Sequence, residues 1–232
     1  DSHWVIWGQG PSGIGKTSFV EHALSGGRGG GGGVVRRGRC HPQEHVRFRA
    51  WDEIAIQLAR HTGRERVESE LATPELAALQ ALFPVFEATS DERPVAPPPD
   101  AELRRVAVAA FRKLLLASSS ARRLVIWIDD LQWANDDSLA LLADLLERGV
   151  GRVVWIFSCR HDGDAALQAR LRGSVSIPTF ELSLGGLDRA DVLGLLGDFG
   201  LRDGVDESTL AVLAVLPMFA PDLATRATAA DP

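Results

Sequence analysis

The sequence has no tyrosine, a single methionine and only two cysteines among its 232 residues. Cys40 and Cys159 both lie in strand-like runs and are far apart in the sequence, so a disulfide framework is not expected and a reducing cytoplasm fits. His41 follows Cys40, but no second pair of cysteines or histidines has the spacing of metal ligands. We therefore interpret Cys40 as a buried thiol beside a loop histidine.

The sequence also lacks a long apolar run and an excess of positive charge. No run reaches the ~18 apolar residues of a membrane-spanning helix. A signal peptide is not expected, because the first apolar run is short and leads directly into a glycine-rich loop. The net charge of −6 argues against a general nucleic-acid binder, although it does not exclude a local basic patch. We expect a cytoplasmic protein whose partners are neither membranes nor, for this segment, nucleic acids.

The most informative feature present is a complete phosphate-binding pattern, G-x-x-x-x-G-K-[ST], at Gly10 to Thr17. An apolar run precedes it and a helix-like run follows it to Leu24, which disfavours a glycine-rich turn that merely ends in Lys-Thr. Glycines let successive backbone N–H groups point at phosphate oxygens, and the helix adds its unpaired N-terminal N–H groups. Lys16 would reach the β- and γ-phosphates, and the Thr17 hydroxyl would hold Mg²⁺. The residues expected to contact nucleotide here are Gly10, Pro11, Ser12, Gly13, Ile14, Gly15, Lys16, Thr17 and Ser18.

Apolar runs alternate with helical patterns along the chain, which is typical of an α/β domain with a mainly parallel sheet. Strands are predicted near residues 4–8, 34–40, 124–128, 153–157 and 175–182. Helices are predicted at 17–24, 51–62, 74–86, 101–117, 136–147 and 163–172. Thr73 is expected to cap the helix that starts at Pro74, and Asn135 to Ser138 to form a loop and N-cap.

The same pattern predicts two domains. Residues 1–183 would form the α/β core, with a flexible glycine-rich loop at 26–33 and an exposed proline-rich connector at 89–100. Two short helical patterns, at 188–199 and 206–216, have no strand between them. Residues 184–232 would therefore form a small helical subdomain.

Two adjacent carboxylates, Asp129 and Asp130, end the strand-like run Leu124 to Ile128. In a parallel sheet, ligands bind beyond the carboxyl ends of the strands, and the phosphate loop leaves its strand at that edge. One carboxylate would hold Mg²⁺, directly or through water, and the other would polarise the attacking water. We assign Asp129 to Mg²⁺ and Asp130 to water, an assignment that the sequence alone could reverse. The structural alternative is a turn or helix-cap acid.

Several arginines need an interpretation. Arg160 follows the run 153–157 and could sense the γ-phosphate, although a surface salt bridge explains it nearly as well. The pairs Arg36-Arg37, Arg104-Arg105 and Arg122-Arg123 are interpreted as solvated charge. That interpretation disfavours a small-molecule P-loop kinase, which needs paired arginines around an acceptor pocket.

The run Leu124 to Asn135 closely resembles the Walker B region of bacterial STAND-class ATPases, which are relatives of the AAA+ proteins. In many of them the stretch continues Asp-Asp-Leu-Gln-Trp-Ala-Asp, and here Asn135 replaces the last aspartate. The resemblance extends to four other pieces: Gly38 to Cys40, Phe48 to Asp52, Leu82 to Val85 and Glu102 to Arg105. Together they look like the ATPase region that some bacterial multidomain regulators and serine/threonine kinases carry.

This resemblance implies a P-loop NTPase three-layer sandwich with a mainly parallel five-stranded sheet in the order 5-1-4-3-2. It also implies ATP with Mg²⁺, a sensor arginine matching Arg160, and a small C-terminal helical subdomain. In that subdomain the family has a Gly-x-Pro element that contacts nucleotide. The nearest match, Val215-Leu216-Pro217, lacks the glycine and leaves Pro217 as the candidate contact. The match fades after Pro217, so we expect a fragment or a shortened relative.

The function predicted from these features is a signalling switch that binds ATP, hydrolyses it slowly and acts on protein partners or fused effector domains. Self-association that depends on nucleotide is left open. The alternative is a nucleotide-dependent scaffold with negligible hydrolysis, which the imperfect Gly-x-Pro element slightly favours. A small-molecule P-loop kinase is a weaker alternative.

Overall fold

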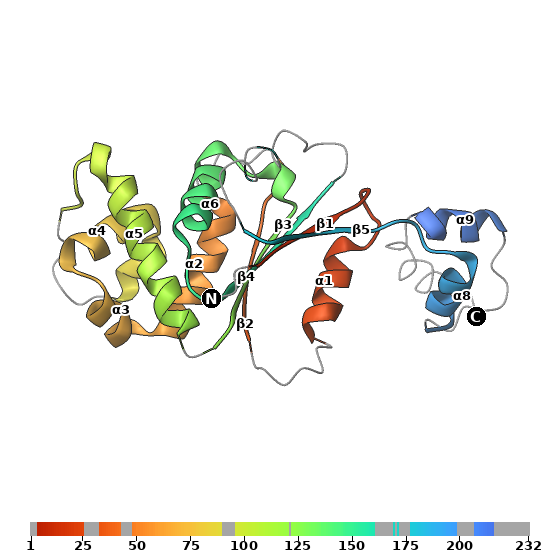
Figure 1. The fold of residues 1–232 in the computed structure, drawn as a ribbon, viewed down its shortest axis with the longest axis horizontal. Helices are drawn as coiled ribbons and strands as arrows, with labels where there is room; N and C mark the ends of the chain where they lie inside the picture. Colours follow the sequence, from red (N-terminus) through yellow and green to blue (C-terminus); the bar gives the residue numbers. More distant parts are fainter. Residues whose placement is uncertain are drawn as a thin grey trace, which may run out of the picture. The chain divides into compact units, whose positions relative to one another are not determined.

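The structure is a computed structural model that describes residues 4–25, 33–42, 48–89, 96–120, 122–160, 169, 171, 177–198 and 207–215. Figure 1 shows the chain as a ribbon. Its strands are β1 (Trp4–Gln9), β2 (Val34–Arg39), β3 (Leu124–Asp129), β4 (Val153–Cys159) and β5 (Thr179–Ser183). Its α-helices are α1 (Lys16–Ser25), α2 (Arg49–Thr62), α3 (Arg64–Glu70), α4 (Thr73–Leu82), α5 (Asp100–Ser119), α6 (Asp136–Arg148), α8 (Arg189–Asp198) and α9 (Glu207–Val215). Two 3₁₀ helices are η1 (Pro84–Thr89) and η2 (Leu131–Trp133).

The strands form one five-stranded sheet in the order β2-β3-β4-β1-β5. This is the order 5-1-4-3-2 that the family resemblance implies, counted from the other edge. β2 pairs with β3, and β3 with β4, in parallel; Arg39 lies opposite Asp129 and Ile128 lies opposite Phe157. The α/β fold with a mainly parallel sheet is therefore confirmed.

The chain divides into two compact units, which are described separately. The first contains residues 1–7, 29–159 and 163–180, and the second contains residues 8–28, 160–162 and 181–232. The predicted boundary between residues 183 and 184 follows a different division and stays a prediction.

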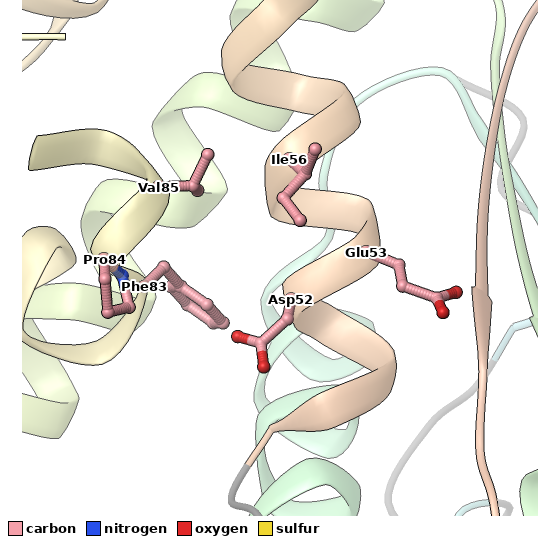
Figure 2. A pocket seen from close by; sticks show the side chains of 6 residues that line it. All are labelled: Asp52, Glu53, Ile56, Phe83, Pro84 and Val85. Carbon is pink, nitrogen blue, oxygen red and sulfur yellow. The ribbon is translucent and has the colours of Figure 1, made fainter. Parts of the chain in front are cut away.

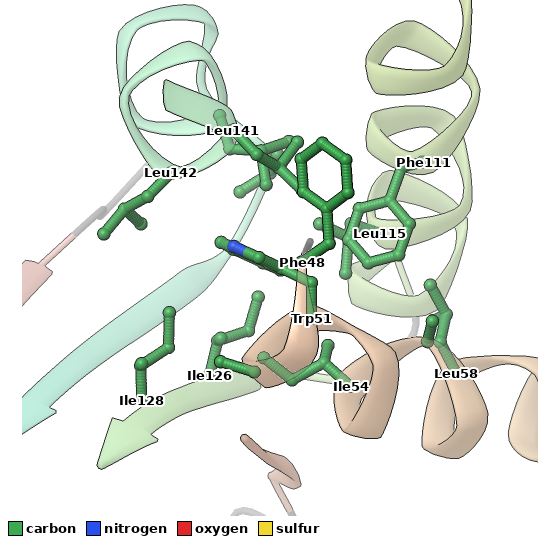
Figure 3. Close-up of a cluster of buried hydrophobic side chains, with 14 of the residues drawn as sticks. Phe48, Trp51, Ile54, Leu58, Phe111, Leu115, Ile126, Ile128, Leu141 and Leu142 are labelled. Carbon is green, nitrogen blue, oxygen red and sulfur yellow. The ribbon is translucent and has the colours of Figure 1, made fainter. Parts of the chain in front are cut away.

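The core of the first unit lies between the sheet and the helices α2 to α6, which gather on one side of strands β2 to β4 (Figure 1). Trp51 is its centre, because its ring meets Phe111 edge-on at 5.8 Å and Trp155 at 6.4 Å between ring centroids. The Trp51 indole N–H is also satisfied, since it donates to the Ser138 carbonyl oxygen at 3.1 Å. Figure 3 shows Trp51 and Phe48 surrounded by aliphatic side chains of β3, α2, α5 and α6.

Helix α2 approaches strand β2 so closely that only glycine fits at position 38. A Cβ atom built on Gly38 would lie 2.0 Å from the Ala50 carbonyl oxygen, far inside van der Waals contact. This close approach explains the glycine in the Gly38-Arg39-Cys40 piece. It also places α2 against the strand that carries Arg37 and Arg39.

In the second unit, α8 and α9 pack on each other through a small apolar cluster. Val192, Leu196 and Leu213 are fully buried, and Leu210 is nearly so. The Leu187 N–H donates to the Ala214 carbonyl oxygen at 2.8 Å. The two helices predicted near 188–199 and 206–216 are therefore confirmed.

Some predictions about local structure were wrong or lie outside the described residues. Thr73 is the first residue of α4 rather than its cap: Ala72 holds the cap position, and its N–H donates to the Glu75 carboxylate at 3.0 Å. Helix α3 was not predicted, because its polar sequence lacks an apolar stripe. Most of the glycine-rich loop, half of the connector and nearly all of the helix predicted at 163–172 are outside the described residues.

Candidate nucleotide site

The phosphate loop joins β1 to α1, as its sequence predicts. Gly13 and Gly15 have φ angles of 80° and 91°, a region that side-chain-bearing residues rarely adopt. The curl closes on α1, where the Phe19 N–H donates to the Gly15 carbonyl oxygen at 2.8 Å. The two glycines therefore give this loop the backbone shape that a phosphate cradle needs.

Lys16 is the first residue of α1, and its side chain folds back over the loop. The residue is only 7% exposed. Its ammonium group donates to the carbonyl oxygens of Gly10 at 2.9 Å and Pro11 at 2.8 Å. The ammonium group of Lys16 is thus held close to the backbone of the phosphate loop. A phosphate anion in the loop would offer the ammonium group a stronger acceptor than these neutral carbonyls.

The residues after Lys16 are more accessible. Thr17 is half-buried and Ser18 is exposed in the first turn of α1. At the other end of the loop, the Leu184 N–H donates to the Gln9 carbonyl oxygen at 2.7 Å, which ties the residue after β5 to the end of β1. The nucleotide contacts assigned to the loop residues stay predictions.

Asp129, the last residue of β3, is fully buried and has a partner for each carboxylate oxygen. Its Oδ1 atom accepts from the Ser158 hydroxyl at 2.6 Å and from the Asp130 N–H at 3.1 Å. Its Oδ2 atom accepts from the Arg37 guanidinium at 3.0 Å. A buried carboxylate needs such partners, because an unpaired charge in the interior is very costly.

Asp130 differs from Asp129 in exposure and backbone conformation. It is partly exposed and has a φ angle of 54°, which is unusual for any residue other than glycine. Its Oδ2 atom accepts two hydrogen bonds from the Arg39 guanidinium, at 2.8 and 3.1 Å, and its Oδ1 atom accepts from Gln132 at 3.0 Å. The pairing with Asp130 raises the pKa of Arg39 above its ordinary value. Asp130 thus keeps its carboxylate partly exposed, whereas the carboxylate of Asp129 beside it is buried.

The interpretation of Arg37 as solvated charge was wrong. Arg37 binds Asp129, stacks its guanidinium over the Trp127 ring at 4.1 Å, and exchanges two backbone hydrogen bonds with the Gln57 side chain. Trp127 in turn donates to the Ser158 hydroxyl at 2.9 Å.

Sequence reasoning also missed Arg39 and Ser158, although a signal was present. Arg37 and Arg39 are two residues apart on a predicted strand, so they share a face. The strand order implied by the resemblance places the second and fourth strands on either side of the third. Side chains at the ends of both neighbours were therefore candidates to meet Asp129 and Asp130.

Arg160 and Pro217 are not tested by the structure in their proposed roles. Arg160 directly follows β4 and is half-buried. Pro217 lies outside the described residues. Within the described part of the chain, no cluster of three or more histidine, cysteine or acidic side chains is arranged to hold a metal ion alone. Within the same residues, no helix is both long and apolar enough to cross a bilayer.

A hollow of about 410 Å³ lies between α2 and the segment that leads into η1. Figure 2 shows that Asp52 and Ile56 of α2 face Phe83, Pro84 and Val85 across it. Glu53 also lines the hollow, and it accepts the Arg39 N–H at 3.0 Å. Two pieces named in the sequence, Phe48 to Asp52 and Leu82 to Val85, therefore meet at this hollow.

The comparisons with known proteins concern the family and the fold. The family model described as an AAA ATPase domain matches residues 9–156. Among solved structures, the chain is similar to a signal transduction ATPase with numerous domains (STAND) that has a tetratricopeptide repeat sensor, from Pyrococcus horikoshii, with 13% identity and a TM-score of 0.44. That match covers 91% of this chain and 25% of the other, so this chain spans a quarter of that protein's length.

Two further solved structures are similar at comparable levels. Drosophila ORC bound to DNA matches with 12% identity and a TM-score of 0.40, over 78% of this chain and 81% of the other. The Aeropyrum pernix ORC2 protein matches with 16% identity and a TM-score of 0.41, over 89% and 48% respectively. No curated protein matches the chain.

Proposed function

Because this chain belongs to the AAA ATPase domain family, we propose that it binds ATP with Mg²⁺ and hydrolyses it slowly, as a switch module of a larger bacterial signalling regulator. The observation that carries the proposal is the phosphate loop. It has positive φ angles at two glycines and a lysine held over its carbonyl oxygens. This backbone shape and this charge suit a nucleoside triphosphate.

The loop residues have separate roles in this proposal. The backbone from Gly10 to Gly15 would surround the β-phosphate, and Lys16 would leave its two carbonyl acceptors for phosphate oxygens. Thr17 would supply a hydroxyl oxygen to Mg²⁺, and exposed Ser18 would lie beside the phosphates. Arg160 would sense the γ-phosphate, and Pro217 would contact the nucleotide from the helical part. All of these assignments rest on sequence position and chemistry.

Asp129 and Asp130 lie in different environments, which suit them to different roles in the reaction. Asp129 is fully buried and held by three hydrogen bonds, so its position is fixed. A fixed carboxylate suits Mg²⁺, and the donor set of Thr17 hydroxyl and Asp129 carboxylate fits this oxygen-preferring ion. When bound, Mg²⁺ would supply charge neutralisation on the phosphates. Asp130 is more exposed and would orient and deprotonate the attacking water.

Arg39 would regulate the activation of water by Asp130. Two hydrogen bonds from its guanidinium occupy one Asp130 oxygen, which keeps that oxygen from accepting a hydrogen bond from the attacking water. Water activation then requires Asp130 to loosen from Arg39, and this requirement supports slow turnover. The same pairing is the observation that favours the alternative, a nucleotide-dependent scaffold with negligible hydrolysis.

The signalling role rests on resemblance and on the small helical cluster. The stretch Asp129 to Trp133 resembles STAND-class ATPases, and α8 and α9 form an apolar cluster of their own. In the proposal, exchange of ADP for ATP shifts this helical part between two arrangements and so changes contact with protein partners or fused domains.

The direct test is calorimetric titration of the whole chain with ATP and Mg²⁺. Wild type should bind, and Lys16→Ala should show no measurable binding. Lys113→Ala is the matched control, because Lys113 pairs with Glu75 and lies outside the loop. Unchanged affinity in Lys16→Ala would sink the assignment of the site.

A further inference from the structure

Helices α5 and α6 form a groove with an unusual number of arginines for an acidic chain. Its volume is about 410 Å³. The lining residues, called here the arginine groove, are Ala101, Arg104, Arg105, Val108, Ala109, Arg112, Asp144 and Arg148. The lining thus contains four arginines and one carboxylate, Asp144, in a chain whose net charge is −6. The interpretation of Arg104 and Arg105 as merely solvated charge does not account for this grouping.

The four arginines are not equally engaged. Arg112 has a structural task, because its guanidinium donates to the carbonyl oxygens of Gly149 at 2.6 Å and Arg148 at 3.0 Å, at the end of α6. The ion pairs of the other two arginines of α5 are long. Arg104 lies 3.9 Å from Asp137, and Arg105 lies 3.9 Å from Glu102.

Because these ion pairs are long, an anion that comes closer to Arg104 or Arg105 would bind more strongly than the present partners do. The Arg105 side chain is 70% exposed, and exposed pairs of this length contribute little to stability. Arg148 is exposed as well. A carboxylate that reached two guanidinium groups at once would gain charge-assisted, bidentate hydrogen bonds that the present pairs do not provide.

We propose that the arginine groove binds an acidic peptide segment of a protein partner. The floor between the arginines is apolar, with Val108 nearly buried and Ala101 and Ala109 exposed. Glutamate or aspartate side chains of the segment bind the guanidinium groups, and a small apolar side chain covers Ala109. The segment is one whose acidic residues alternate with small apolar residues.

Asp144 favours a peptide over nucleic acid. Asp144 is a carboxylate inside the groove, and a peptide backbone offers N–H donors to it, whereas a phosphodiester backbone has none. The proposal does not depend on nucleotide binding.

Fluorescence anisotropy of the whole chain tests the proposal with a fluorescein-labelled peptide of repeated Glu-Ala units. The double variant Arg105→Glu/Arg148→Glu should weaken binding by about tenfold or more. The matched control Arg122→Glu/Arg123→Glu makes the same change of charge at two exposed arginines outside the groove and should retain wild-type affinity. Circular dichroism melting establishes that each variant is folded.

Shape is tested separately from charge. Ala109→Trp fills the floor without changing the charge and should weaken binding about as much. Ala101→Trp does the same at the other end of the groove if Ala109→Trp does not fold. Equal loss of affinity in the control double variant would overturn the proposal, because the attraction would be nonspecific. Stronger binding of a single-stranded or duplex oligonucleotide through the same arginines would overturn it in favour of nucleic acid.

Discussion

The phosphate loop and the acidic pair are built in different ways. The loop is local: Lys16 binds carbonyl groups five and six residues away. The acidic pair depends on distant residues, since Arg37 is 92 positions from Asp129 and Ser158 is 29 positions from it. The loop therefore carries its structure in consecutive residues. The charge environment of the pair depends on how three strands align.

The largest effect on folding should come from Asp129. Asp129→Ala removes a fully buried carboxylate and leaves the Arg37 guanidinium, the Ser158 hydroxyl and the Asp130 N–H without this acceptor. We expect the free energy of unfolding to fall by about 3 kcal/mol. Urea denaturation measures it. Asp130→Ala is the matched control and should cost less than about 1 kcal/mol, since Asp130 is partly exposed. Equal losses would contradict the difference drawn between the two acids.

A smaller effect on folding is expected at Lys16. Lys16→Ala removes two hydrogen bonds to loop carbonyl groups and should lower the free energy of unfolding by about 1 kcal/mol. Chemical denaturation without nucleotide checks this value. If the loss matched that of Asp129→Ala, the structure of the loop would not depend on its own consecutive residues alone.

Arg39 is expected to affect catalysis more than stability. Arg39→Ala removes two hydrogen bonds from Asp130 and frees its Oδ2 atom to accept a hydrogen bond from the attacking water. Single-turnover hydrolysis should therefore accelerate several-fold, while the free energy of unfolding changes by less than about 1 kcal/mol. Arg37→Ala provides the contrast, because its partner Asp129 is buried, and it should destabilise the fold. A slower rate in Arg39→Ala would show that Arg39 assists the reaction.

The smallest effect on stability is expected at Glu75, which lies outside both the phosphate loop and the acidic pair. Burial raises the pKa of Glu75, but hydrogen bonds from Lys113 and the Ala72 N–H, with the Lys113 charge, lower it more, so the net pKa lies below the ordinary value of 4.5. A lowered folded pKa means that this stabilisation is fully present above pH 4.5 and is lost as the pH falls through the folded value. Glu75→Gln should flatten the dependence of stability on pH in that acidic window. Denaturation curves at several pH values measure this dependence. If the free energy of unfolding depended on pH equally in wild type and Glu75→Gln, the pairing of Glu75 with Lys113 would not stabilise the fold.

The same contrast explains what the sequence could predict. Strands β1 and β3, helix α1 and the Asn135 cap, whose oxygen accepts the Ser138 N–H at 2.9 Å, follow from apolar runs and short spacings. Helix α3 could not be predicted, because only Val67 of its residues is buried and its other side chains are polar or charged. To predict the partners of Asp129 and Asp130, one needs both the strand order and the alternation of side chains along β2. Arg37 looked like solvated charge because the strand order that the resemblance implies was not combined with the face on which Arg37 lies.

Single-turnover hydrolysis by the whole chain tests the central claim most directly. Enzyme in excess would be mixed with radiolabelled ATP and Mg²⁺, and labelled phosphate would be followed in wild type and in Asp130→Asn. We expect phosphate from wild type within minutes, and ATP that stays bound and intact in Asp130→Asn. ATP that stays bound and intact for hours on wild type would contradict hydrolysis and leave the nucleotide-dependent scaffold as the function.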